Sequence, residues 1–322
     1  MRTIQITRPD DWHVHLRDHD VLQHTVFATA SHFARALIMP NLQPALTTLA
    51  AVNAYRQRIL AVCNQNNHFV PYMTLYLNAN VAPDDLQQMK QHPHILGAKF
   101  YPAGATTNSE EGARSIRALY PLLEIMQAQD LVLQIHGEVT HGDIFAREGL
   151  FIEEHLIPLT RDFPKLRMVL EHISTRAAVD FVMQAPETVV ATITPHHLLY
   201  NRNQLLVGGV KPHYYCLPIL KHERDQIAVQ EAAMSGNRKF FAGTDSAPHS
   251  QARKESACGC AGIYSAPFAV AMYAQVFDSL GALPKLNDFM SHFGAQFYQL
   301  PISKDCIELL EKPQVVPPSL PF

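Results

Sequence analysis

The sequence predicts an α/β protein in which eight parallel strands close into a (β/α)8 barrel, the TIM-barrel fold. Short apolar runs rich in Val, Ile, Leu and Phe recur along the chain and end in polar residues, with helix-length segments between them. Their spacing of roughly 20 to 50 residues suits a strand followed by a crossover helix. The expected strands are residues 11–17, 34–41, 69–78, 95–102, 131–138, 167–173, 189–196 and 239–245.

An open, doubly wound sheet is the alternative arrangement of the same elements. It is disfavoured because no Gly-x-Gly-x-x-Gly or Gly-x-x-x-x-Gly-Lys-Ser/Thr motif follows an early strand, so the usual phosphate-binding loops are missing. Residues 84–91, 109–127 and 225–234 carry helix formers, and Pro83 stands where the first of these helices would begin. Residues 1–5 begin a further strand-like segment.

The 322 residues suffice for one large α/β domain or two smaller ones. No Gly/Ser-rich linker, low-complexity run or charge block divides them, so we expect a single barrel domain over residues 1–322, with an irregular, proline-rich tail from about 312 to 322. A formal charge of −3 without a Lys/Arg cluster disfavours nucleic acid as a partner. No apolar stretch reaches the length of a membrane span. A small-molecule partner fits better.

The five cysteines are scattered, and no apolar signal-peptide core follows the first residues. Both observations predict a cytoplasmic protein. Cys258 and Cys260 are the only close pair, and their spacing differs from the Cys-x-x-Cys of zinc and redox sites, so we interpret them as structural.

Polar residues close several of the expected strands, at the end of the barrel where chemistry is normally located. In chain order they are His13 and His15, Asn41, Lys99, His136, His172, His196 or His197, and Asp245. A single such residue is more often a hydrogen-bonded cap than a ligand. Taken together, the nitrogen and oxygen ligands at the ends of strands one, five, six and eight predict a metal site at one mouth of the barrel. His13 and His15 also stand two residues apart, so both imidazoles point to the same side of a strand.

Lys99 is the unusual member of this set, because an ammonium repels metal cations and has no lone pair to give. A neutral lysine amine can add carbon dioxide to form a carbamate, whose two oxygens can each hold one metal ion. The other interpretation is a lysine held near a carboxylate or a substrate anion. Residue chemistry alone leaves both open.

The set of expected ligands resembles the amidohydrolase superfamily, and the matching is most similar to the shorter, bacterial type of its dihydroorotase family. The similar segments occur in the family's order, over nearly the whole chain to about residue 300. They are 11–17 (DWHVHLR), 39–41 (MPN), 99–102 (KFYP), 105–108 (ATTN), 171–174 (EHIS), 208–212 (GGVKP) and 243–249 (GTDSAPH). The C-terminus looks shorter than is usual for this type.

The resemblance implies two zinc ions per subunit, bridged by a hydroxide and by Lys99 as N6-carboxylysine. The remaining implied ligands are His13, His15 and Asp245 at the more buried ion, and His136 and His172 at the other. Asp245 is also the implied general acid/base, which takes the hydroxide proton and returns it to the leaving amide nitrogen. The same ligands accept zinc, cobalt or manganese.

The implied reaction is the reversible, zinc-dependent cyclisation of N-carbamoyl-L-aspartate to (S)-dihydroorotate and water in de novo pyrimidine (UMP) biosynthesis. Arg17 offers a planar fork of donors for the substrate carboxylate; the alternative is a surface salt bridge. The implied substrate contacts are His15, Arg17, Asn41, His136, Leu217, His249 and Ala261. Thr106 and Thr107 lie in a segment that closes over the substrate in the family, although a polar surface turn would have the same composition.

Two other functions remain open. A hydantoin or dihydropyrimidine ring hydrolase would keep the metal site but act on rings without the carboxylate that Arg17 and Asn41 would bind. A non-catalytic scaffold protein would have lost metal ligands, whereas every expected ligand is present here. The resemblance also suggests a homodimer, and we interpret His196 and His197 as structural residues near the rim.

Overall fold

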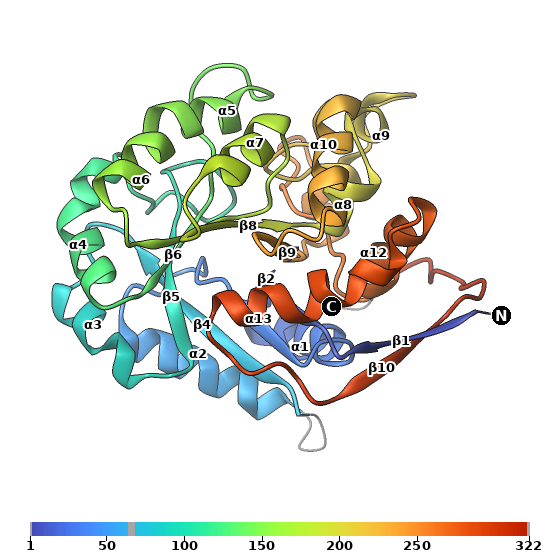
Figure 1. Ribbon diagram of the computed structural model, residues 1–322, viewed down its shortest axis with the longest axis horizontal. Coiled ribbons are helices and arrows are strands. Elements are labelled where there is room, and N and C mark those ends of the chain that lie inside the picture. Colours follow the sequence, from blue (N-terminus) through green and yellow to red (C-terminus); the bar gives the residue numbers. More distant parts are fainter. Residues whose placement is uncertain (1, 64–67, 321–322) are drawn as a thin grey trace.

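The computed structural model describes residues 2–63 and 68–320, in which eight parallel strands wind into a barrel (Figure 1). Each strand pairs with the next in chain order. The strands are β2 (Asp10–Val14), β3 (Arg35–Ile38), β4 (Val70–Leu77), β5 (Ile95–Phe100), β6 (Val132–Ile135), β7 (Arg167–Leu170), β8 (Val189–Ile193) and β9 (Phe240–Ala242). Every one falls within an expected strand or overlaps it, and the barrel prediction is confirmed.

The barrel closes between β2 and the segment that follows β9. The backbone N–H of Asp245 donates to the carbonyl of His13 at 2.8 Å, and the N–H of His15 donates to the carbonyl of Ser246 at 3.0 Å. The buried Asp11 carboxylate joins the same two segments, because it accepts from the backbone N–H groups of His13 and Thr244. The first and last strands therefore meet at the residues predicted to bind metal.

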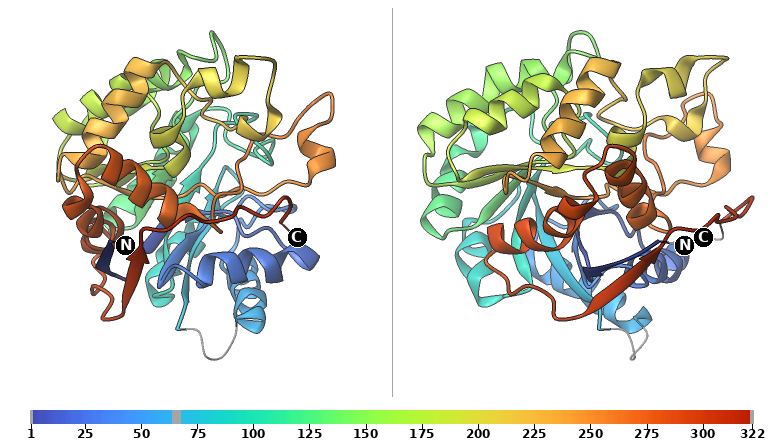
Figure 2. Two further views of the ribbon diagram at one scale, coloured as in Figure 1. Left: turned by 90° about the vertical axis from the view of Figure 1, so that its right-hand side faces the viewer. Right: turned by 45° about the vertical axis from the view of Figure 1, so that its right-hand side comes forward.

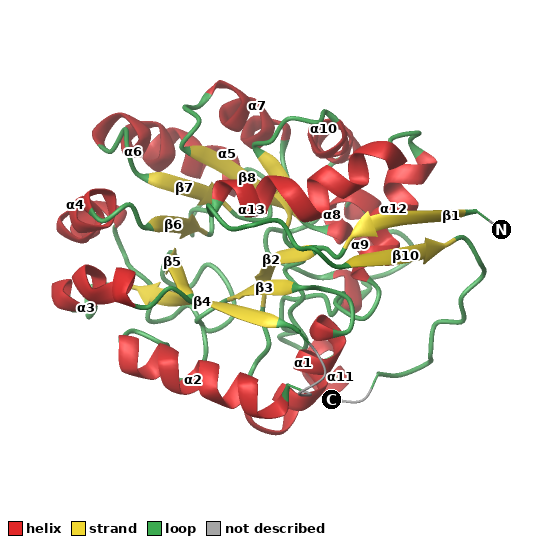
Figure 3. Ribbon diagram, turned by 60° about the horizontal axis from the view of Figure 1, so that its bottom comes forward, coloured by secondary structure: helices red, strands yellow, loops and turns green. Residues whose placement is uncertain are grey.

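Helices surround the strands (Figure 3). They are α1 (Leu22–Ala30), α2 (Leu49–Val62), α3 (Pro83–Gln88), α4 (Tyr120–Ala128), α5 (Arg147–Phe151), α6 (Ile157–Asp162), α7 (Arg176–Gln184), α8 (Pro195–Leu199), α9 (Arg202–Leu206), α10 (Glu223–Met234), α11 (Gln251–Lys254), α12 (Ala269–Ser279) and α13 (Phe293–Phe297). Short 3-10 turns cover His19–Val21, Met89–Gln91, Ile116–Leu119, Pro212–Tyr214 and Leu283–Lys285, and π turns cover Ile152–Leu156 and Asp288–His292. The expected helices at 84–91 and 225–234 are present as α3 with the 3-10 turn after it and as α10.

The helix expected over residues 109–127 is wrong in its first half. Residues 109–115 are irregular, and the helix α4 begins only at Tyr120, with Pro121 in its first turn. Ser109 instead braces a loop, since its hydroxyl donates to the carbonyl of Thr106 at 2.6 Å. Gly112 lies so close to the chain that an added Cβ would be 2.5 Å from the carbonyl oxygen of Tyr101. These contacts hold the segment against the barrel in place of a helical turn.

Both faces of the strands are buried, and alternate residues point to different cores. Outward residues pack against the helices, while an inner cluster that includes Trp12, Val169 and Phe241 fills the barrel. Tyr298, which follows α13, stacks on Trp12 with ring centroids 4.7 Å apart. The backbone of Phe297 accepts from Arg167, the first residue of β7, so α13 covers the end of the barrel where the strands begin. The opposite end remains for the site.

A small antiparallel ribbon lies outside the barrel (Figure 2). Strand β1 (Thr3–Thr7) pairs with β10 (Cys306–Leu310), from Thr3 opposite Leu310 to Thr7 opposite Cys306. The sequence indicated a strand-like start but did not predict β10, whose alternate residues are exposed. Residues 311–320 contain no helix or strand. Within the residues that the structure describes, no helix has the length and apolar character needed to cross a membrane.

We expect Gly294→Ala to lower the free energy of unfolding by about 2 kcal/mol, the range for overpacking a core. Gly294 is helical, so alanine would ordinarily stabilise it, but its Cβ would lie 2.0 Å from Nε1 of Trp12. Urea unfolding followed by far-UV circular dichroism would measure the change. Gly149→Ala in α5 is the matched control, because the nearest atom to its Cβ would be 4.0 Å away. Equal stability of the two variants would contradict the close packing of α13 on Trp12.

Candidate active site

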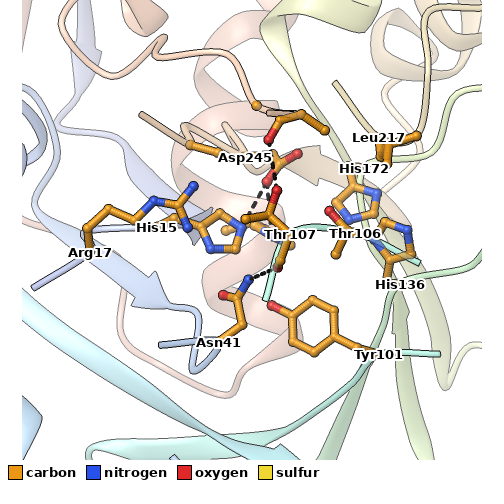
Figure 4. Close-up of a pocket in the computed structure, with 14 residues that line it drawn as sticks. His15, Arg17, Asn41, Tyr101, Thr106, Thr107, His136, His172, Leu217 and Asp245 are labelled. Atoms are coloured by element: carbon orange, nitrogen blue, oxygen red, sulfur yellow. Dashed lines mark hydrogen bonds and ion pairs between the residues drawn. The ribbon is translucent and has the colours of Figure 1, made fainter. Parts of the chain in front are cut away.

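A pocket of about 350 Å³, including the part open to solvent, lies at the carboxyl ends of the strands. Figure 4 shows Arg17 and Asn41 on one side of it and His136 and His172 on the other. Eleven residues expected at the site line the pocket: His13, His15, Arg17, Asn41, Thr106, Thr107, His136, His172, Leu217, Asp245 and Ala261. Tyr101, Ala247 and Gly262 line it as well and were not foreseen. Lys99 and His249 do not line the pocket but lie beside residues that do.

His13, His15 and Asp245 form a compact buried cluster at the seam of the barrel. Oδ1 of Asp245 lies 3.1 Å from Nε2 of His15 and 3.4 Å from Nε2 of His13. Their potential ligand atoms all lie within 4.8 Å of one another, a spacing that suits a single cation. Burial raises the pKa of the Asp245 carboxyl, but the hydrogen bond to His15 and the neighbouring imidazoles outweigh burial and leave that pKa well below its usual range.

A buried carboxylate behind the cluster fixes the orientation of His13. Oε2 of Glu171 lies 2.9 Å from Nδ1 of His13 and accepts from the hydroxyl of Thr192 at 2.5 Å. The proton of His13 therefore belongs on Nδ1, and the lone pair of Nε2 faces Asp245. Glu171 occurs in a segment that carried the family resemblance, but the sequence suggested no role for it.

His136 and His172 complete the histidine group, with ring centroids 4.8 Å apart. The ring of His172 is also 5.0 Å from that of His13, so the two halves of the site adjoin. Nε2 of His136 lies 3.1 Å from the buried carboxylate of Glu138, which leaves Nδ1 of His136 as the nitrogen free for a ligand role. Lys221 lies 3.7 Å from the other oxygen of Glu138 and balances its charge.

Lys99 lies on the inner face of β5 and is fully buried. Burial lowers the pKa of its amine to about 8, against the opposing effect of Glu171 and Asp245. Within residues 2–63 and 68–320, its Nζ finds no hydrogen-bond partner, and the same is true of Nε2 of His13 and Nδ1 of His172. Buried polar atoms are normally paired, so these three call for a further group between them. The donor set of imidazoles, a carboxylate and an amine fits a metal centre.

Arg17 lies in the opposite wall of the pocket, and His249 lies beside it. A guanidinium nitrogen of Arg17 lies 3.1 Å from Nε2 of His249, and Nε of Arg17 donates to the carbonyl of Pro248 at 3.2 Å. No Asp or Glu in the described part of the chain forms an ion pair with Arg17, so the surface salt bridge considered as its alternative role is absent there. The guanidinium remains available to an anionic ligand.

The loop that carries Thr106 and Thr107 lies over the pocket, where both residues form part of the lining. The amide of Asn41 donates to the carbonyl of Thr107 at 3.1 Å, and the Thr107 hydroxyl donates to the carbonyl of Ala261 at 3.3 Å. Asn108 donates back to the carbonyl of Asn41 at 3.2 Å. These contacts join three separate strand-end segments, unlike the polar surface turn that was the alternative.

His196 and His197 are both buried, in the short helix α8 that follows β8. With Cys216 they form a second group of potential ligands. Both ring nitrogens of His197 already have partners, the hydroxyl of Thr194 at 2.8 Å and the carbonyl of Pro218 at 3.0 Å. Burial also raises the pKa of the Cys216 thiol, which opposes the thiolate form that binds metals. A structural role fits His197 and Cys216 better.

Comparison with known proteins identifies the family of this chain. The amidohydrolase family model matches residues 10–309. The chain belongs to the amidohydrolase family. It is 56% identical to a dihydroorotase of Nitrosococcus oceani over 322 residues, which cover 99% of this chain and 93% of that protein.

Two solved structures of this amidohydrolase fold are also similar. A dihydroorotase from Campylobacter jejuni gives a TM-score of 0.87 at 36% identity, over 95% of this chain and 87% of that one. A dihydroorotase from Saccharomyces cerevisiae, in complex with 5-fluoroorotic acid, gives 0.86 at 34% identity, over 94% and 86%. The resemblance read from the sequence segments is confirmed, and family membership implies a metal-dependent enzyme.

We expect Glu171→Gln to weaken metal binding about 10- to 100-fold, the usual effect of losing a carboxylate that orients a histidine ligand. The amide no longer accepts a charge-assisted bond from Nδ1 of His13 and can present its NH2 group there instead. Competition with a chromogenic chelator would measure the affinity. Glu231→Gln on exposed α10 is the control. Metal affinity equal to that of the control would exclude Glu171 from this role.

Proposed function

We propose that this chain is a dihydroorotase, which interconverts N-carbamoyl-L-aspartate and (S)-dihydroorotate with release or uptake of water in de novo pyrimidine biosynthesis. One observation carries the proposal. A single pocket contains both the buried ligand cluster of His13, His15 and Asp245 and the guanidinium of Arg17, which forms no ion pair in the described part of the chain. Dihydroorotate has the matching pair of groups, a hydrolysable ring amide and a carboxylate. The names of the similar proteins support the same substrate.

The residues fit two zinc ions per subunit. His13, His15 and Asp245 would hold the more buried ion, His136 and His172 the other, and Lys99 would bridge them. Bridging requires N6-carboxylysine: the neutral amine adds to carbon dioxide, an N–C bond forms, and one proton leaves to give a carbamate anion. When bound, the ions would lower the pKa of a water molecule and polarise the substrate carbonyl. Cobalt or manganese would suit the same ligands.

Asp245 is the proton carrier of the proposed reaction. Its carboxylate is ionised near neutral pH because its pKa lies well below the usual range. In ring opening, water adds to the ring amide carbon, Asp245 accepts a water proton, and the same proton passes to the amide nitrogen as the C–N bond breaks. Ring closure follows the reverse path and releases water.

The opposite wall orients the substrate. Arg17 would bind the carboxylate with Asn41 and His249, while backbone groups at Leu217 and Ala261 would reach the ring amides. His15 and His136 line the pocket close to the reacting bond, and closure of the Thr106–Thr107 loop would exclude bulk water. Hydantoin and dihydropyrimidine rings lack a carboxylate, so the unpaired Arg17 favours dihydroorotate over them. A scaffold role does not account for a complete ligand set.

Two further properties follow from the same proposal. The five cysteines form no disulfide, which supports a reducing compartment such as the cytoplasm. A homodimer is proposed from the family resemblance.

The deciding experiment follows ring opening of dihydroorotate by the purified protein as isolated, after chelation and after zinc is restored. We expect turnover that is lost with the metal and recovered with about two zinc ions per chain, because the buried ligands can act only around a cation. Apo protein restored with magnesium is the control, since this donor set suits zinc far better. A zinc-loaded protein without turnover of either dihydroorotate or N-carbamoyl-L-aspartate would contradict the proposal.

We expect Arg17→Met to raise KM for dihydroorotate by about 100-fold, the effect of removing one side of a charge-assisted contact. The carboxylate then loses its bidentate partner, whereas the metal ligands stay in place. Steady-state kinetics would measure KM, with Arg58→Met as the control, because Arg58 is an exposed arginine that pairs with Asp18. An unchanged KM would remove Arg17 as the carboxylate anchor.

A further inference from the structure

Lys254 is a buried cation that the proposed mechanism does not use. It ends the short helix α11, and only 3% of its surface is exposed. Its Nζ donates to three backbone carbonyls: those of Tyr215 at 2.9 Å, Cys260 at 2.8 Å and Gly262 at 2.8 Å. No carboxylate of the described residues forms an ion pair with it. All three N–H groups of the ammonium therefore donate to backbone carbonyls.

The three carbonyls belong to two chain segments that line the pocket. One segment leads from Tyr215 to Leu217, and the other runs from Cys260 to Gly262. The N–H of Gly262 donates to the carbonyl of Tyr215 at 3.0 Å, so the two segments also bond directly to each other. Gly262 has a φ of +145°, and an added Cβ would lie 2.5 Å from the carbonyl oxygen of Ala247. A glycine is therefore required at this crossing.

Lys254 holds the backbone on both sides of Ala261. The carbonyls of Cys260 and Gly262 both accept from its Nζ, so the carbonyl of Ala261 lies between two fixed groups. That carbonyl accepts from the loop hydroxyl of Thr107 at 3.3 Å and lies 2.9 Å from Nε2 of His249. The loop that carries Thr107 and the pocket wall near His249 therefore meet at the carbonyl of Ala261, which lies between the two carbonyls that Lys254 holds.

We propose that Lys254 is a positioning residue for substrate binding, which holds the pocket wall at Leu217 and Ala261 in the orientation that receives the substrate ring and the closing loop. The inference rests on the proposed function. Its positive charge also reaches the pocket, since it contributes, after burial and Arg17, to the lowered pKa of His249. A pocket wall that contacts the ring equally well in the bound substrate and in the transition state affects KM more than kcat.

The test compares Lys254→Met with Arg253→Met, which removes an exposed cation one residue away. We expect Lys254→Met to raise KM for dihydroorotate by about ten-fold or more, with kcat within about three-fold and the zinc content unchanged. Arg253→Met should match the wild type. If Lys254→Met does not fold, Lys254→Gln is measured in the same way, because its amide keeps a donor but not the charge.

A double-mutant cycle with Thr107→Val tests whether Lys254 acts through the carbonyl of Ala261. Both side chains act on that group, so their effects should not be independent. The increase in KM of the double variant should be smaller, by about three-fold or more, than the product of the increases of the two single variants. Independent, fully multiplicative effects would overturn the proposal. So would a KM equal to that of Arg253→Met, or a loss of zinc and kcat at unchanged KM, which would make Lys254 a structural support of the metal centre. Absence of wild-type turnover would instead reject the proposed function itself.

Discussion

Closure of the barrel between its first and last strands is the constraint on which the site depends. The Asp11 carboxylate accepts from the backbone of His13 at 3.2 Å, from the backbone of Thr244 at 2.8 Å and from the Thr244 hydroxyl at 2.6 Å. Burial raises the pKa of this carboxyl to about 7, and these donors oppose the rise. Because they brace the residues on either side of the seam, His13 and Asp245 meet there with little freedom. The hydrogen bonds that close the barrel therefore also fix the positions of the ligand cluster.

Around this seam, buried acids hold the imidazoles in defined orientations. Glu171 faces His13, and Glu138 faces His136, so each ring has its proton on the nitrogen directed away from the site. A buried carboxylate is costly without partners, and each has one: Thr192 for Glu171 and Lys221 for Glu138. His172 and Asp245 also have positive φ values of 44° and 45°, a conformation that non-glycine residues adopt rarely and mainly at functional sites. Strain and buried charge thus concentrate at the mouth of the barrel.

The sequence predicted what local pattern determines. Strands buried on both faces are continuous apolar runs, and the side chains that end them must share one mouth, which made His13, Lys99 and Asp245 recognisable. Residues 109–115 have a helix-compatible composition, and only the contacts of Ser109 and Gly112 with distant backbone exclude the helix. The role of Glu171 depends on its side chain facing the inside of the barrel. The only sequence signal for this was that Glu171 stands two residues after Val169, which also faces inward. Contacts between loops, such as Thr107 with Ala261, have no local signature.

The distribution of buried cations favours an anionic ligand in the pocket. The structure buries Arg35, Lys99, Lys221, Lys239 and Lys254 among the residues that it describes. Arg35 pairs with Asp10, Lys221 with Glu138 and Lys239 with Glu187. The other two, Lys99 and Lys254, form no ion pair there, and both lie next to the pocket, as does the unpaired, half-buried Arg17. Since a buried charge is stable only with a counter-charge or full hydrogen bonding, a pocket wall with Arg17 in it favours an anionic ligand.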